Sequence, residues 1–64
     1  MSAETLFWAG ESFRMGRDVP MAFRYYNRCR WDDPESEAGK YARGRLALPE
    51  MLAQFEREAD LEDE

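Results

Sequence analysis

Three prolines limit the length of any helix this chain can form, because proline removes a backbone donor and its ring clashes with the preceding turn. They stand at Pro20, Pro34 and Pro49. Pro20 and Pro34 each fit the first turn of a helix, where the missing N–H is no loss. Pro49 must either kink a helix sharply or begin a new one at its first position, and both alternatives stay open. The sequence therefore predicts an all-α chain of short helices.

The first predicted helix has signals at both ends. It begins after Ser2, whose hydroxyl can accept the Thr5 backbone N–H, and runs to about Met15. Gly16 is expected to end it in the left-handed conformation common at helix C-termini. The inner stripe of this helix, at helical spacing, consists of Leu6, Ala9, Gly10 and Phe13.

The second predicted helix covers about residues 19–31, with Asp18 as its N-cap. Its inward residues at helical spacing are Ala22, Tyr26 and Cys29. Asp32 followed by Glu35 has the spacing of a capping box, which predicts the start of a third helix near Pro34. The third helix is expected to reach at least Leu46, with further helix after the break to about residue 59.

Residues 3–34 also fit a longer spacing pattern without a gap. The residues that fit it are Leu6, Ala9, Gly10, Phe13, Ala22, Tyr26 and Pro34. This segment resembles one tetratricopeptide repeat, a helix-turn-helix unit that holds other proteins. The resemblance implies that Gly10 and Ala22 lie where the two helices cross, with Phe13 and Tyr26 beside them.

A partial second copy follows at the same period, since Tyr41 comes 34 residues after Phe7 and Gly44 comes 34 after Gly10. We therefore expect one domain over residues 1–64, built from a hairpin (3–34), a capping helix (35–59) and an acidic tail (60–64). Such repeats contact only their neighbours, so a lone one should dimerise or dock onto a partner protein.

Composition and charge argue against a catalytic or metal-binding site. The net charge is −5, from nine Lys and Arg against fourteen Asp and Glu, and the sequence contains no histidine. Cys29 is the single cysteine, so it forms no disulfide within the chain and suggests a reducing compartment. The sequence has no apolar run of membrane-spanning length. We expect a cytoplasmic, non-catalytic protein without metal or cofactor.

The resemblance implies that a partner lies in a concave groove lined by the first helix of each repeat. The matching positions here are Phe7, Glu11, Arg14, Met15, Tyr41, Arg45 and Leu48. They suggest an apolar floor at whose edge Arg14 or Arg45 clamps a carboxylate of the partner. The same apolar residues could instead be packed core of a three-helix unit.

The sequence suggests two other candidate binding surfaces. Aromatic residues off the inward stripes could form a self-association surface, namely Trp8, Phe23 and Trp31. A basic face beside Trp31 could bind nucleic acid through Arg17, Arg24 and Arg28. We favour pairing of those arginines within the chain, with Asp32, Asp33, Glu35 or the tail, over nucleic-acid binding.

Overall fold

The computed structural model describes residues 1–62, and in that range it contains four α-helices and no strand. They are α1 (Ala3–Met15), α2 (Val19–Asp32), α3 (Glu37–Leu46) and α4 (Pro49–Glu62). The all-α prediction is confirmed, and of the two alternatives left open at Pro49, a kink or a new helix, the structure shows a new helix. Residues 63–64 of the predicted acidic tail lie outside the described residues, and its first residues belong to α4.

Helix α1 begins and ends where the sequence predicts, but the left-handed conformation predicted at Gly16 is wrong. Ser2 Oγ accepts the Thr5 backbone N–H at 3.1 Å. Gly16 has a φ of −82°, and the left-handed residue is Arg17, with a φ of 64°. The Arg17 N–H donates to the Arg14 carbonyl at 3.0 Å, and the Asp18 N–H donates to the Phe13 carbonyl at 2.8 Å. This paired bonding fixes the reversal one residue after the glycine.

The N-cap predicted for α2 is confirmed, because Asp18 Oδ1 accepts the Met21 backbone N–H at 3.3 Å. The capping box predicted for α3 is wrong. Asp32 still belongs to α2, so it cannot cap the next helix. Ser36 is the N-cap instead, and its hydroxyl accepts the Gly39 backbone N–H at 3.0 Å and donates to the Asp33 carbonyl at 2.8 Å.

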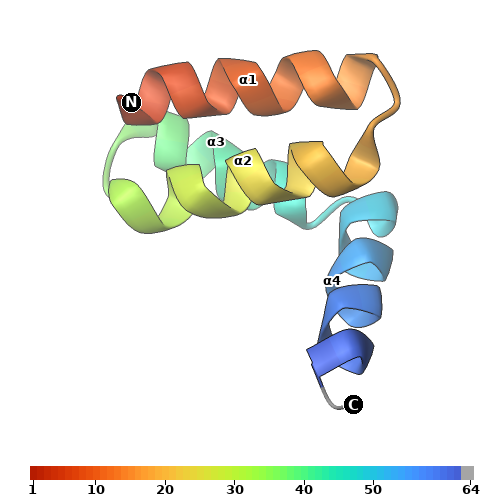
Figure 1. The fold of residues 1–64 in the computed structure, drawn as a ribbon. Coiled ribbons are helices and arrows are strands. Elements are labelled where there is room, and N and C mark those ends of the chain that lie inside the picture. Colours follow the sequence, from red (N-terminus) through yellow and green to blue (C-terminus); the bar gives the residue numbers. More distant parts are fainter. Residues whose placement is uncertain (63–64) are drawn as a thin grey trace.

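The first three helices and the first turn of α4 enclose one core. Helices α1 and α2 lie side by side and antiparallel, and α3 lies against both of them (Figure 1). The buried apolar residues are Leu6, Phe7, Ala22, Phe23, Tyr26, Cys29, Ala42, Leu46 and Met51. Gly10 permits the close approach of α1 and α2, since a Cβ there would lie 2.7 Å from ring carbons of Tyr26.

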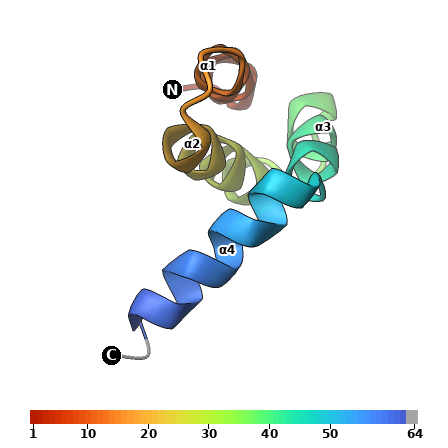
Figure 2. The same cartoon turned by 90° about the vertical axis from the view of Figure 1, so that its right-hand side faces the viewer.

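Helix α4 runs away from the other three helices (Figure 2). Its buried residue Met51 anchors it to the core, and Phe55 contacts Phe23 with ring centroids 6.4 Å apart. Leu52 and Phe55 remain more than half exposed. The predicted capping segment 35–59 therefore consists of two helices. Gly44, one period after Gly10, faces open space, because a Cβ there would meet nothing within 4 Å.

Candidate functional site: a groove between α1 and α3

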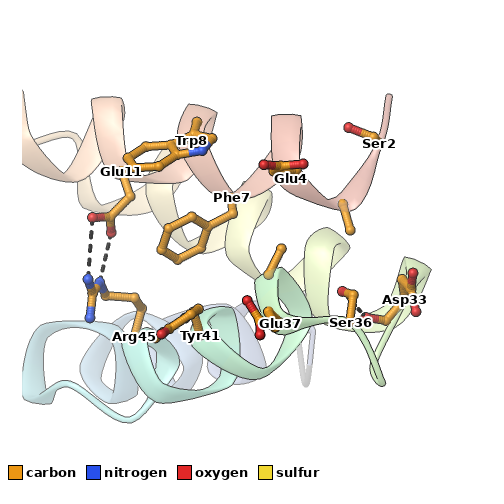
Figure 3. Close-up of a pocket in the computed structure, with 12 residues that line it drawn as sticks. Ser2, Glu4, Phe7, Trp8, Glu11, Asp33, Ser36, Glu37, Tyr41 and Arg45 are labelled. Atoms are coloured by element: carbon orange, nitrogen blue, oxygen red, sulfur yellow. Dashed lines mark hydrogen bonds and ion pairs between the residues drawn. The ribbon is translucent and has the colours of Figure 1, made fainter.

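A groove of about 650 Å³ lies between α1 and α3. Figure 3 shows its two walls, with Phe7 reaching from α1 toward Tyr41 on α3. Three aromatic rings form its apolar part. The Phe7 ring centroid lies 5.5 Å from that of Trp8 and 6.0 Å from that of Tyr41. Phe7 is buried, whereas Trp8 and Tyr41 are each 61% exposed, so two accessible rings flank a buried one.

An ion pair closes one end of the groove. Glu11 on α1 and Arg45 on α3 face each other across it (Figure 3). Arg45 Nε donates to Glu11 Oε1 at 2.8 Å, and Arg45 Nη2 donates to Glu11 Oε2 at 3.4 Å. Arg14 Nη2 donates to the same carboxylate at 3.3 Å, and the Tyr26 hydroxyl donates to Glu11 Oε1. This buried carboxylate therefore has three partners from three helices.

The network fixes the protonation of its members. Burial by itself raises the pKa of Glu11, but hydrogen bonds from Arg45, Tyr26 and Arg14 outweigh it and lower the pKa to about 2. Burial, together with the hydrogen bond to Glu11, raises the pKa of Tyr26 to about 12. At neutral pH the carboxylate is therefore charged and the phenol is a neutral donor.

The structure separates the seven residues predicted to bind a partner. Phe7, Glu11, Tyr41 and Arg45 line the groove. Arg14 lies behind the closed end, Met15 is 76% exposed outside the lining, and Leu48 packs against the core. Phe7 is itself a core residue, so the reading of these positions as packed core holds for Phe7 but not for the exposed Tyr41.

The predicted carboxylate clamp does not have free arginines. Arg45 and Arg14 both bind Glu11, so the chain supplies the carboxylate itself. The expectation overlooked this because the spacing pattern assigns each residue to a face and does not balance the charges on that face. One signal was available: Glu11 and Arg45 are 34 residues apart, one full repeat period.

The other end of the groove is acidic. Its lining there includes the carboxylates of Glu4, Asp33 and Glu37, together with Ser2 and Ser36. None of these was among the predicted site residues, because they belong to helix starts and to the α2–α3 turn rather than to a helical stripe. Both α1 and α3 begin with a glutamate in the first turn, and this sequence signal could have placed them.

The other predicted surfaces are partly occupied by the chain. Trp8 and Trp31 are exposed, but Phe23 is buried and contacts Phe55. Arg28 pairs with Asp32 at 4.0 Å, which confirms one of the expected intrachain pairs. The Arg30 guanidinium lies 4.6 Å from the ring centroid of Trp31. The remaining arginines of the predicted basic face, Arg17 and Arg24, are exposed.

Cys29 is a core residue. It is fully buried, and its Sγ–H donates to the Ala3 carbonyl at 3.1 Å. Burial raises the pKa of the thiol, and the charges of Asp32 and Asp33 raise it further, so the thiol stays protonated at neutral pH.

Across residues 1–62, no cluster of three or more metal-binding side chains is present. No helix in this range is long and apolar enough to cross a membrane.

Comparisons with known proteins place the chain in no family. No protein-family model matches it, and neither a curated protein nor a solved structure matches it. The resemblance to a tetratricopeptide repeat therefore depends on the residues quoted above.

Proposed function

We propose that this chain is a non-catalytic protein-binding module whose α1–α3 groove holds a helical or extended segment of a partner. One observation carries the proposal: Trp8 and Tyr41, each 61% exposed, flank the buried ring of Phe7 along a groove. Tryptophan and tyrosine are enriched at binding hot spots, where they fill or line apolar pockets. The tetratricopeptide-like hairpin supports the same proposal, since repeats of that type bind proteins through such a surface.

The spacing between the two walls of the groove is fixed within the folded chain, before any partner binds. The Arg45–Glu11 bridge joins α3 to α1, and Tyr26 connects the same carboxylate to α2. Because its walls are fixed within the folded chain, little ordering would be required on binding, and preorganisation of this kind favours affinity.

The two exposed tryptophans provide a matched test. Trp8 is 61% exposed and lines the groove, whereas Trp31 is 66% exposed and lies outside the lining. The intact protein, Trp8→Ala and Trp31→Ala would each be immobilised and exposed to lysate of the source cells. We expect a protein retained by the intact chain and by Trp31→Ala but lost with Trp8→Ala. Direct binding of that purified protein would then be measured by calorimetry.

Other outcomes would contradict the proposal and identify its alternative. Retention that both variants keep would place the interface elsewhere. Retention abolished by nuclease and by the double substitution Arg24→Glu with Arg28→Glu would favour the nucleic-acid surface. Light scattering over a concentration series would detect self-association. Phe7 is unsuitable for such tests, because it is a core residue whose replacement would damage the fold.

A further inference from the structure

We infer that the segment bound in this groove presents a basic side chain, an arginine or a lysine, to the rings of Trp8 and Tyr41. The inference rests on the proposed function and specifies the chemistry of the partner. It reverses the expectation of a partner carboxylate, which was drawn from the arginines alone.

The charges of the groove give the first argument. Its lining contains the carboxylates of Glu4, Glu11, Asp33 and Glu37, and its one cation is Arg45. Glu11 is balanced inside the protein by Arg45 and Arg14. The other three carboxylates remain at the open end. Lys40 adds a cation beside them, since it lines the adjoining pocket with Glu37 and Tyr41. The open end therefore has an excess of negative charge, and such an excess concentrates ligands of the opposite sign, so this end of the groove attracts a cation.

The aromatic rings give the second argument. A guanidinium or ammonium group is attracted to the face of an aromatic ring within about 6 Å of its centroid. The chain already uses this contact twice, with Arg30 at 4.6 Å from Trp31 and Arg45 at 5.7 Å from Phe7. Within residues 1–62, neither Trp8 nor Tyr41 has such a cation from the chain itself. Both rings are exposed, and they lie between the Glu11–Arg45 pair and the carboxylates of Glu4 and Glu37 (Figure 3). A cation drawn in by Glu4 and Glu37 would therefore have these rings next to it.

The closed end explains why an acidic ligand is disfavoured. A partner carboxylate at Arg45 would lie beside the charged Glu11 carboxylate, which already accepts from Arg45 Nε and Nη2. It would be repelled by Glu11 if both stayed, and displacing the buried Glu11 would leave that charge without its partners, which is costly. The groove therefore discriminates by attraction at one end and by exclusion at the other.

Glu4 and Glu37 also lie in the first turns of α1 and α3, where a carboxylate stabilises the helix. A purely structural role would leave ligand binding unchanged when these charges are removed and the fold is kept. The two roles are therefore distinguished by a binding measurement on folded variants.

The probe is N-acetyl-argininamide, with its neutral isostere N-acetyl-citrullinamide as the control ligand. Two-dimensional ¹H–¹⁵N NMR resolves the indole N–H groups of Trp8 and Trp31, and a Trp31→Phe variant assigns them. We expect the arginine compound to shift the Trp8 signal saturably, while the Trp31 signal stays in place and the citrulline compound has no effect.

The protein variants are matched in charge. Glu4→Gln with Glu37→Gln removes two groove carboxylates, and Glu50→Gln with Glu56→Gln removes two exposed carboxylates of α4 that do not line the groove. The first pair should weaken binding of the arginine compound about fivefold, and the second pair should leave it unchanged. Far-UV circular dichroism confirms that all variants stay folded.

Three results would overturn the inference: equal shifts with both compounds, equal weakening by both double variants, or no Trp8 shift at the highest soluble concentration. These failures are distinguishable from failure of the proposed function. If a protein partner depends on Trp8 but the arginine compound does not bind, the protein-binding proposal stands and only the preference for a cation is wrong. If the arginine compound binds but no protein depends on Trp8, the groove is a cation site and the protein-binding proposal is wrong.

Discussion

Arg45 Nε donates a 2.8 Å hydrogen bond to Glu11 Oε1 across 34 residues of sequence, and this contact joins α3 to α1 at the closed end of the groove. The Glu11 side chain is 11% exposed and that of Arg45 is 37% exposed. Ion pairs at fully exposed positions contribute little to stability. This one is partly buried and shares its carboxylate with Arg14 and Tyr26, so its removal has measurable consequences.

Glu11→Gln should lower the free energy of unfolding by about 2 kcal/mol, because two arginines lose their counter-charge and the buried Tyr26 hydroxyl keeps only a neutral acceptor. Urea denaturation followed by circular dichroism measures this difference. Glu56→Gln, at an exposed position of α4, is the control and should change stability by less than about 0.5 kcal/mol. Equal effects of the two substitutions would show that the network adds nothing to stability.

At acidic pH, the wild type and Glu11→Gln should have nearly the same free energy of unfolding. The pKa of Glu11 is lowered from 4.5 to about 2 in the folded protein. Because the pKa is lower in the folded state, Glu11 stabilises the protein at any pH above the pKa of the unfolded state. This contribution is lost as the pH falls from 4.5 toward 2. Unfolding of both proteins measured across this range tests the prediction, and the pH dependence of the Glu11 carboxyl ¹³C shift locates the pKa directly. A difference that stays constant across the range would contradict it.

Tyr26 predicts a second change in stability at alkaline pH. Its pKa is raised from 10.0 to about 12, so its contribution is complete below pH 10 and is lost as the pH rises toward 12. Tyr26→Phe should cost about 1 kcal/mol at neutral pH and should lack this alkaline loss. Thermal unfolding at increasing pH compares it with Tyr25→Phe, which leaves the hydroxyl of Tyr26 in place and should retain the loss.

Arg17→Gly should stabilise the protein by about 1 kcal/mol, because the left-handed φ of 64° is strained for arginine but not for glycine. Gly16→Ala provides the matched test, since the φ of Gly16 is −82° and a Cβ there would be in ordinary contact, 3.4 Å from the Ser12 carbonyl oxygen. Alanine at this position should not destabilise. If Gly16 were the left-handed residue, both thermal melting shifts would have the opposite sign.

Two glycines of α3 should respond in opposite ways to alanine. A Cβ at Gly39 would collide with the backbone carbonyl of Asp33, so Gly39→Ala should cost about 2 kcal/mol or more. Gly44 faces open space within a helix, so Gly44→Ala should stabilise by about 0.8 kcal/mol through helix propensity. Chemical denaturation of both variants checks the prediction, and a cost at Gly44 would indicate a surface that is covered in solution.

The sequence was sufficient for local structure where a side chain bonds its own backbone. Ser2 and Asp18 were identified as caps because the donor lies three residues away in each case. The same reasoning gave a wrong result at Asp32. The spacing of a capping box occurs in many places, and whether Asp32 can cap the next helix depends on where α2 ends. The end of α2 depends on packing of the whole hairpin, and local spacing does not encode it.

The site was predictable only in part. The period of 34 residues predicts that Phe7 and Tyr41 line the same surface, and their ring centroids lie 6.0 Å apart. The mutual neutralisation of Glu11, Arg14 and Arg45 could not be derived from the face each occupies, because it depends on distances across two helices. The acidic end also escaped prediction, since Asp33 reaches it through a turn whose conformation Gly39 permits.

The groove has consequences for handling the protein. Ser2 and Glu4 line it, and the N-terminal end of α1 lies at its open mouth (Figure 3). A purification tag or fluorophore fused ahead of Ser2 would sit at the binding surface, and a cationic tag would compete for the acidic end. Helix α4 leads away from this region (Figure 2). Attachment after the last turn of α4 therefore orients the molecule on a sensor with its groove facing the solution.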